Sequence, residues 1–422
     1  MADGRNPSRQ FAANQLKRVQ LVSFPEALHP VVNRTRLVWA MGIIQILAWG
    51  STYYLPAVLA APIARDTGWS ITSVVGGLSW GMLIAGATSP TVGRHIDRHG
   101  GRVVMALSSF LLAVGIATMG VAENLATYYF AWSLIGVSMA AGLYDAAFST
   151  LGRLLGEGAR TSITGLTLLG GFASTLGWPA MAAMEEWLGW RGTCLCIAAA
   201  HLLVGLPVHA LMIPGSARQP LRPVVIRNDD MTTRTPRQSS ALFLLIGMML
   251  TLLALVVSSV SVHLLDTLKQ LGIMTAVALA IGMVIGPAQV AARIAEFSIG
   301  RNLHPTWSAR VGVLLCLFGL GLLISGRPWI SFVAIALYGA GNGILTIARG
   351  TLPLALFGAQ GYGSRMGLLA RPVLVAQACG PILAAWVLDT FGAALLLSML
   401  CCLLMVCVVI SVFLPAKNHP MA

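Results

Sequence analysis

Asp145 is an acidic residue inside an apolar stretch that is long enough to cross a membrane. A carboxylate in that position is costly to bury, so it indicates a function: carrying a proton or contacting a charged solute. It lies about six residues from Leu151, where we expect its helix to end, or about 9 Å below the membrane surface. The alternative is a structural ion pair with Arg153 or another arginine, which would keep Asp145 ionised. The sequence leaves both interpretations open.

Two arginines at predicted helix ends could supply the opposite charge for an anionic solute. Arg371 lies some six residues into one apolar stretch, and Arg349 ends another. Long arginine side chains also reach the membrane surface from such depths, so anchoring at the interface is the alternative for both. His263 closes a third stretch and is either a solvated rim residue or a proton relay. The candidates for proton coupling or substrate contact are Asp145, Tyr144, Arg371, Arg349 and His263.

Uncharged polar and aromatic residues are candidates for the wall of a solute cavity. Gln45, Trp49 and either Ser51 or Tyr53 fall near one face of a helix. Tyrosines are also common in the aromatic belts at membrane surfaces, which is the alternative for Tyr53 and Tyr54. The cavity candidates are Gln45, Trp49, Tyr53, Tyr54, Asn342 and Gln377.

The composition indicates the class of protein in which these residues act. Hydrophobic residues make up 57% of the chain and charged residues 10%, and the mean hydropathy is +0.80, whereas soluble domains contain about 25% charged residues. We therefore expect a polytopic membrane protein. The net charge of +13 does not indicate nucleic-acid binding, because the charges fall between apolar stretches. The seven cysteines lie inside apolar stretches without metal-ligand partners, so we interpret them as packing residues and expect no metal site.

Twelve stretches are long and apolar enough to be membrane-spanning helices, which need about 20 residues each. Only helices and closed barrels satisfy the backbone in lipid, and continuous apolar runs favour helices. The predicted ranges are 37–60, 69–91, 103–122, 127–151, 162–185, 191–213, 240–263, 271–292, 308–326, 329–349, 365–387 and 391–414.

Basic residues predict the orientation of these spans, because lysine and arginine concentrate in cytoplasmic segments. With a cytoplasmic N-terminus, 23 of the 27 fall on the cytoplasmic side and 4 on the other. The longest polar interruption separates spans six and seven. The predicted organisation is a cytoplasmic arm (1–36), a six-helix bundle (37–214), a cytoplasmic linker (215–239), a second six-helix bundle (240–414) and a cytoplasmic tail (415–422).

The segment from Gly93 to Arg102 is predicted to be a short charged turn at the cytoplasmic surface. Its carboxylate, Asp97, would lie among cations or face a helix N-terminus. The same pattern recurs in the second half at identical internal spacing, which indicates duplication. The residues of the two copies are Gly93, Arg94, Asp97, Arg98, Gly101, Arg102, Arg293, Glu296, Gly300 and Arg301.

The first copy resembles the signature between the second and third helices of the major facilitator superfamily, roughly Gly-x-x-x-Asp-Arg-x-Gly-Arg-Arg, with one residue's ambiguity between Gly100 and Gly101. With the twelve spans and the repeat, the resemblance covers residues 37–414. Within the superfamily, the chain is similar to the bacterial monocarboxylate and oxalate/formate porters, on this segment and on Thr67-Gly68-Trp69-Ser70 after the first span. The antiporter motif of the fifth helix is not met.

The resemblance implies two helical bundles around a central cavity, with rocking between inward-open and outward-open states. It also implies that spans one, four, seven and ten line the cavity. The segment from Gly93 to Arg102 would then act as a conformational latch that stabilises the outward-open state through Asp97. The alternative is a topology anchor alone.

The sequence contains no nucleotide-binding Gly-x-x-x-x-Gly-Lys loop and no His-Glu-x-x-His pair, so we expect neither an enzyme, nor catalytic residues, nor a cofactor. The predicted function is secondary transport of a small organic solute, with proton-coupled uptake of a small carboxylate as the leading hypothesis. Export of an amphipathic compound is one alternative, and a transport-inactive sensor of the same fold is another. We expect a monomer in the bacterial inner membrane, with both termini cytoplasmic and with the solute, protons and lipid as partners.

Overall fold

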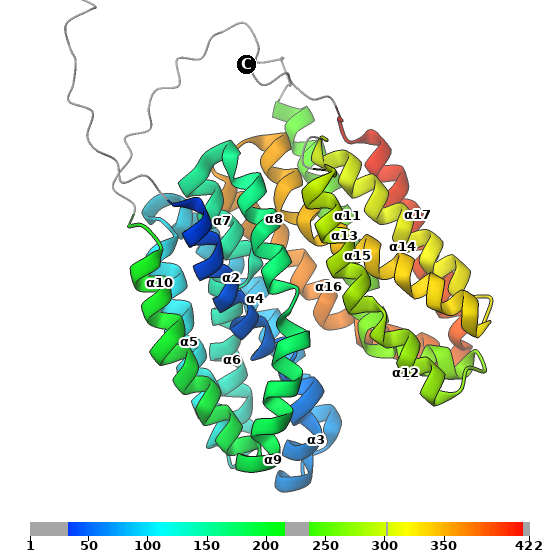
Figure 1. The fold of residues 1–422 in the computed structure, drawn as a ribbon, viewed down its shortest axis with the longest axis horizontal. Helices are drawn as coiled ribbons and strands as arrows, with labels where there is room; N and C mark the ends of the chain where they lie inside the picture. Colours follow the sequence, from blue (N-terminus) through cyan, green and yellow to red (C-terminus); the bar gives the residue numbers. More distant parts are fainter. Residues whose placement is uncertain (1–32, 216–235, 301–302, 417–422) are drawn as a thin grey trace, which may run out of the picture. The chain divides into compact units, whose positions relative to one another are not determined.

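A computed structural model describes residues 33–215, 236–300 and 303–416. The predicted arm up to residue 32, most of the predicted linker, Arg301 and the tail from residue 417 lie outside the described residues. Contacts divide the chain into two units, Met1–Arg34 and Thr35–Ala422, and the membrane helices belong to the second. The described residues are helical with short connections, as the apolar stretches predict (Figure 1).

The first half of the second unit forms one group of helices (Figure 1). It contains a 3₁₀ turn (Gly156–Gly158) and a π-helical turn (His201–Gly205). Its α-helices are α2 (Arg34–Gly50), α3 (Leu55–Thr67), α4 (Ile71–His99), α5 (Gly101–Gly120), α6 (Leu125–Gly142), α7 (Tyr144–Leu155), α8 (Ala159–Gly170), α9 (Ala173–Ala200) and α10 (Leu206–Met212).

The second half forms another group, which has its own apolar core. Its helices are α11 (Pro236–Gln270), α12 (Thr275–Met283), α13 (Ile285–Ser298), α14 (Pro305–Leu323), α15 (Pro328–Phe357), α16 (Tyr362–Phe391) and α17 (Ala393–Phe413).

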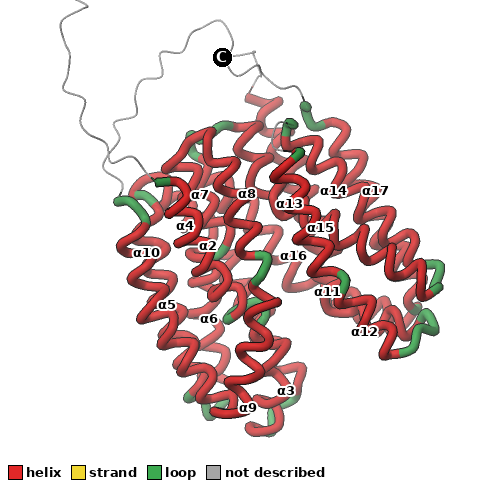
Figure 2. The backbone as a smooth tube through the Cα atoms, in the orientation of Figure 1, coloured by secondary structure: helices red, strands yellow, loops and turns green. Residues whose placement is uncertain are grey.

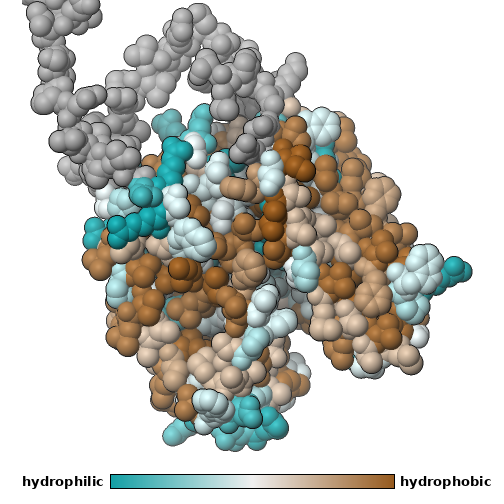
Figure 3. Space-filling model, viewed as in Figure 1, coloured by the Kyte–Doolittle hydropathy of each residue, from teal (hydrophilic) through white to brown (hydrophobic). Residues whose placement is uncertain are grey.

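Within the described residues, ten helical segments are long and apolar enough to cross a membrane. One of them, Leu125–Met212, is 88 residues long and contains α6 to α10. It is far longer than one crossing needs, and it is interrupted around Gly156 and at Gly189, whose φ is +66°. Three crossings in this segment make the helices consistent with twelve in all. The flanks of both groups are apolar and hydrophilic residues gather at the ends, as a polytopic membrane protein requires (Figure 3).

Several membrane helices are broken in the middle (Figure 2). The first crossing is interrupted by a turn at residues 51–54, between α2 and α3. The fourth is interrupted at Leu143, which is extended between α6 and α7. Irregular backbone at membrane depth is tolerated where it is buried in protein or lines a cavity, and Ser51, Thr52 and Leu143 at these breaks are buried.

The predicted turn from Gly93 to Arg102 is wrong in its extent. Helix α4 continues through His99, and α5 begins at Gly101, so the turn is essentially Gly100 with a φ of +88°. Only glycine adopts that conformation at little cost. The charged residues therefore lie on the last two turns of one helix and the first turn of the next, not in a loop.

The two groups meet at one end and separate at the other. We call the end at which α4 and α7 finish and α8 and α16 begin the closed end, because helices of both groups contact one another there. At the opposite, open end, Figure 3 shows a cleft between them. The chain is thus in a conformation that is open to one side.

Glycines bring α4 and α16 together near the closed end. A methyl group on Gly93 would overlap the carbonyl oxygen of Gly363, and one on Gly367 would overlap that of Ser89. The backbones can approach this closely only because both positions lack a side chain. The closed conformation depends on this contact.

We expect Gly93→Ala to weaken the α4–α16 contact and destabilise the closed conformation by about 1–3 kcal/mol, since a methyl group overpacks the contact. Thermal unfolding in detergent should show a lower Tm than for the wild type. Gly321→Ala is the control, because a methyl group there meets nothing within 4 Å. Equal melting temperatures for the two variants would contradict the packing argument.

Candidate functional site

An ion pair between Asp145 and Arg349 joins the two halves near the closed end. Arg349 donates from Nε to Asp145 Oδ1 at 3.1 Å and from Nη2 to Oδ2 at 2.6 Å. The side chains are only 16% and 19% exposed. Such a two-point contact is among the strongest that an arginine makes. The geometry shows the ion-pair alternative for Asp145, with Arg349 as the partner.

The helix boundaries explain why both charges are deep in the protein. Asp145 lies in the first turn of α7, where the helix dipole favours a carboxylate, and ten residues before the end of that helix. Arg349 lies eight residues before the end of α15. The predicted position of Arg349 at a helix end was wrong because α15 continues to Phe357. At 1.5 Å per residue, the pair is roughly 12–15 Å from the closed end.

Aromatic side chains close the space around this ion pair. The Tyr362 hydroxyl donates to the Gly350 carbonyl at 2.6 Å, and its ring packs directly on Gly152 of the other half. Phe148 packs on Gly350 and stacks on Tyr144, with ring centroids 5.3 Å apart. These apolar rings lower the local dielectric beside the pair, which strengthens its attraction and raises the cost of losing one partner.

Arg293 is the charged residue whose environment differs most from the prediction. The repeat predicted that it lies at the cytoplasmic surface, but it is within α13 and only 4% exposed. Its Nη1 donates to the Thr167 carbonyl of the other half at 2.9 Å. Weaker contacts of 3.4 Å reach the Gly343 carbonyl and the Thr346 hydroxyl. Among the residues that the structure describes, no carboxylate lies within ion-pair distance of it.

A cluster of aromatic rings lies at the breaks in the first and fourth crossings. Trp49 is its centre, with ring centroids at 4.9 Å from Tyr144, 5.7 Å from Tyr53 and 6.5 Å from Tyr54. Tyr54 in turn meets Trp178 of α9 at 5.8 Å. Tyr54 and Tyr144 are also electrostatic neighbours of Arg293. We call Trp49, Tyr53, Tyr54, Tyr144 and Trp178 the ring cluster.

Gln45 holds the break in the fourth crossing together. Its amide donates to the Gly142 carbonyl at 2.6 Å, and its oxygen accepts from Trp49 Nε1 at 3.0 Å. Gly142 ends α6, so its carbonyl lacks a partner within the helix. Gln45 is fully buried and was predicted to line the cavity. Its contacts show that it positions Trp49 and the broken helix instead.

Asp97 caps the N-terminus of α16. Oδ1 accepts from the Gly363 N–H at 2.8 Å, and Oδ2 accepts from the Ser364 N–H at 2.7 Å and its hydroxyl at 2.6 Å. These backbone donors have no partner inside α16, and the helix dipole adds to the attraction. Of the two predicted environments, the structure shows the helix N-terminus. The Asp97 carbonyl accepts from Arg153, the arginine first suggested for Asp145.

The second copy of the pattern makes different contacts from the first. Glu296 accepts from the Ser308 hydroxyl at 2.6 Å and lies 3.8 Å from Arg160, which donates to the Gly300 carbonyl at 3.1 Å. Arg94 is exposed and bonds only to Thr91, whereas its counterpart Arg293 is buried. Spacing alone therefore identified the repeat but not equivalent side-chain roles.

The remaining predicted residues lie apart from the ion pair. Arg371 is exposed and has no bonding partner among the described residues, and His263 bonds to the Pro381 carbonyl at 2.8 Å. Asn342 and Gln377 are partly exposed, and neither side chain bonds to a described residue. Arg98 and Arg102 are exposed near the closed end.

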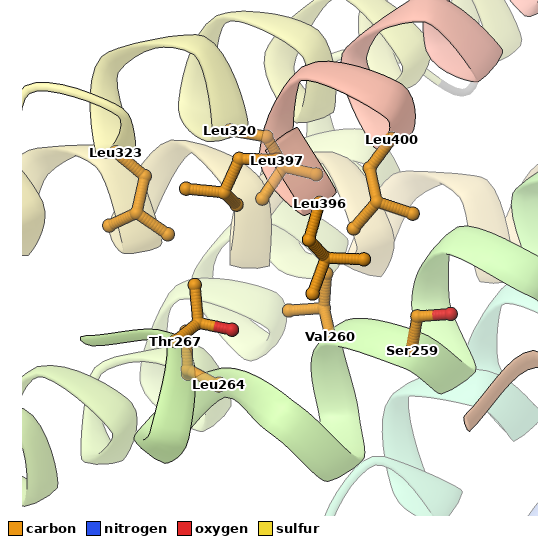
Figure 4. Close-up of a pocket in the computed structure, with 9 residues that line it drawn as sticks. All are labelled: Ser259, Val260, Leu264, Thr267, Leu320, Leu323, Leu396, Leu397 and Leu400. Atoms are coloured by element: carbon orange, nitrogen blue, oxygen red, sulfur yellow. The ribbon is translucent and has the colours of Figure 1, made fainter. Parts of the chain in front are cut away.

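A small apolar cavity between α11, α14 and α17 is separate from these polar groups (Figure 4). Leucines, a valine and two hydroxyl residues line it, and none is charged. Nothing in its chemistry would orient a polar solute. Its lining residues are Ser259, Val260, Leu264, Thr267, Leu320, Leu323, Leu396, Leu397 and Leu400.

Sequence reasoning missed three features of the site. Trp178 and Tyr362 were not among the predicted site residues. The internal position of Arg293 was missed because its helix was predicted to end at residue 292, one residue before it. In the sequence, Glu296 is the one acidic residue close to Arg293. This lack of other partners was the signal that could have singled out Arg293.

The comparisons with known proteins agree with this geometry. A family model described as Major Facilitator Superfamily matches residues 41–303. This match covers more than half of the chain, which belongs to that family and is a multi-pass membrane transporter. No curated protein sequence matches it significantly.

Two solved structures share the fold over most of their length. The human organic anion transporter MFSD10 (TETRAN) has a TM-score of 0.70 at 17% identity, covering 91% of this chain and 100% of that one. The proton:xylose symporter XylE, bound to 6-bromo-6-deoxy-D-glucose, has a TM-score of 0.69 at 13% identity, covering 91% and 97%. At these identities the similarity establishes the fold alone.

We expect Asp145→Asn to open the closed end. It leaves Arg349 buried without a counter-charge, which costs about 3–5 kcal/mol. Hydrogen exchange measured by mass spectrometry should become faster in the parts of α7 and α15 near the closed end. Asp145→Asn combined with Arg349→Gln should recover part of the protection, since no charge is then left unpaired. Unchanged exchange in the single variant would show that the pair does not hold this end.

Proposed function

We propose that this protein is a secondary transporter of small organic anions, with carboxylates as the substrate class. The observation that carries the proposal is the buried Arg293 guanidinium without a carboxylate partner. A cation inside a membrane protein is costly unless it is paired, and a substrate can supply the missing charge. The fold neighbour MFSD10, which is named an organic anion transporter, supports the same class.

The surroundings of Arg293 suit a small carboxylate. A guanidinium has five N–H donors, and only one of the three contacts that Arg293 makes is short, so donors remain for a two-point contact with an anion. The ring cluster beside it offers flat apolar surface and the hydroxyls of Tyr54 and Tyr144. The alternating-access cycle would bring the solute to this layer from the open end.

The ion pair of Asp145 and Arg349 is proposed to couple transport to protons. Protonation of Asp145 removes its charge and therefore its hold on Arg349, so the closed end can separate. The same residue would then act as both gate and proton carrier. Asp97 at the N-terminus of α16 would act as the latch that favours the conformation described here. Symport with protons follows from this scheme.

The orientation is also part of the proposal. The distribution of basic residues supports a cytoplasmic closed end and cytoplasmic termini in a bacterial inner membrane. The described conformation is then outward-open. We further propose that a monomer suffices for transport, since one chain supplies the complete site.

We expect Arg293→Gln to abolish the response to small carboxylates. Removing one partner of a buried charge contact costs about 2–5 kcal/mol, which is roughly a 30-fold to several-thousand-fold loss of affinity. The measurement is the transient current of proteoliposomes on a solid-supported membrane at pH 6 and pH 8. Formate, lactate and oxalate represent carboxylates, xylose represents sugars, and tetraphenylphosphonium represents lipophilic cations.

The matched control is Arg371→Gln, which removes an exposed arginine without a described partner. It should retain the wild-type currents, and Arg293→Lys should retain a weakened response. Carboxylate currents that survive Arg293→Gln would contradict the anion site. A wild-type response to tetraphenylphosphonium alone would instead favour the export of amphipathic compounds.

A further inference from the structure

Two histidines are buried in the sixth crossing, away from the ion pair and from Arg293. His201 is 0% exposed and His209 is 1% exposed. His201 Nε2 lies 2.7 Å from the Ser51 hydroxyl, and His209 Nδ1 lies 2.9 Å from the Ser109 hydroxyl and 2.8 Å from the Met105 carbonyl. The other nitrogen of each ring, His201 Nδ1 and His209 Nε2, is buried without a partner. Buried polar atoms without partners are rare and often mark water.

The backbone is arranged to bring these groups together. His201 to Gly205 form a π-helical turn, which is rare and is frequent at functional sites. Pro207 follows at the start of α10, and its ring and missing N–H prevent a regular α-helix through this point. The wider turn accommodates the proline and places His201 against Ser51 and His209 against α5.

Gly205 lies beside atoms of both halves of the network. A methyl group built on it would lie 3.1 Å from Ser109 Oγ and 3.4 Å from His201 Nδ1. These two atoms are therefore at most 6.5 Å apart, the sum of the two distances. A water molecule that bonds to both can bridge up to about 5.6 Å, twice an ordinary hydrogen bond.

The network connects two parts of the protein that matter for transport. Ser51 lies in the break of the first crossing, two residues before Tyr53 of the ring cluster. His209 lies three residues before Met212, the last residue of α10, or about 5 Å from the closed end. The groups thus form a polar line from the middle of the membrane toward the closed end.

No charged side chain competes for these rings among the described residues. The electrostatic neighbour of His201 is His209, and the polar partners of His209 are the Ser109 hydroxyl and the Met105 carbonyl. The charged and titratable residues of the adjoining helices lie at the helix ends or are cysteines: Arg34 and Arg36 on α2, Arg102 on α5, and Glu185, Glu186, Arg191, Cys194 and Cys196 on α9.

We propose that a buried water between His201 and Ser109 completes this chain, and that the chain carries protons between the ring cluster and the closed end. His209 takes a proton at Nε2 from the closed end and releases to Ser109 the Nδ1 proton that otherwise points to the Met105 carbonyl. Ser109 passes a proton to the water, the water passes one to His201 Nδ1, and His201 Nε2 releases one to Ser51. Each group loses one proton as it gains one, so no net charge accumulates. The path is independent of the solute proposed above.

The first test measures hydration. Protein labelled with ¹⁵N-histidine is reconstituted in liposomes, and solid-state NMR records magnetisation transfer from water to the ring nitrogens. We expect transfer to His201 Nδ1 in the wild type. Transfer should be several-fold slower in Gly205→Ala, whose methyl group would lie beside both Ser109 Oγ and His201 Nδ1. Gly321→Ala, which has nothing within 4 Å, is the control and should match the wild type. A dry His201 ring in the wild type would overturn the proposal.

The second test measures proton flux without any solute. Liposomes loaded with pyranine are given a potassium diffusion potential with valinomycin, and internal acidification is followed. The wild type and Gly321→Ala should exceed protein-free liposomes, and Gly205→Ala should lose most of that excess. If Gly205→Ala does not fold, Ser109→Ala replaces it. Ser109→Ala removes one relay hydroxyl and should also lose most of the excess flux. Equal flux in the wild type and the variants would overturn the path. Neither test uses a solute, so a failure of the anion proposal would not change the result expected from either test.

Discussion

A charge inside a membrane has to find its counter-charge within the protein, because lipid cannot solvate it. Asp145 and Arg349 are 204 residues apart and belong to different halves of the chain. In the described conformation each charge is neutralised by the other half. The backbone N–H groups at the start of α16 also depend on the other half, because Asp97 accepts their hydrogen bonds. Opening this end therefore requires a proton, water or a solute to replace what the other half supplied.

The broken helices position the groups that meet this requirement. The break at residues 51–54 turns the aromatic residues of the first crossing toward the middle of the protein, and the break at Leu143 places Asp145 at the start of a helix. A break in the membrane frees carbonyl groups that must be satisfied locally. Gln45 does so for Gly142 and at the same time orients Trp49. One hydrogen-bonded chain therefore joins the broken helix to the ring cluster.

Arg293 differs from the other buried charges because its contacts are to carbonyl and hydroxyl oxygens only. These acceptors orient the guanidinium but supply no opposite charge. Its contact with Thr167 crosses between the halves, so the site and the closed end share a residue. An anion that binds Arg293 would compete with this contact and change the balance between conformations.

The sequence by itself determined the class of protein and most of the fold. The apolar stretches, their number and the charged segment after the second span predicted the family, because the length and hydropathy of a membrane helix are set by the bilayer. Asp145 was also identified, because a carboxylate in an apolar stretch is conspicuous. Only the tertiary structure decided which arginine pairs with it, that Arg293 is buried and that Gln45 is structural. These depend on contacts between residues far apart in the chain, and hydropathy and spacing record position along a helix without recording which neighbour a side chain meets.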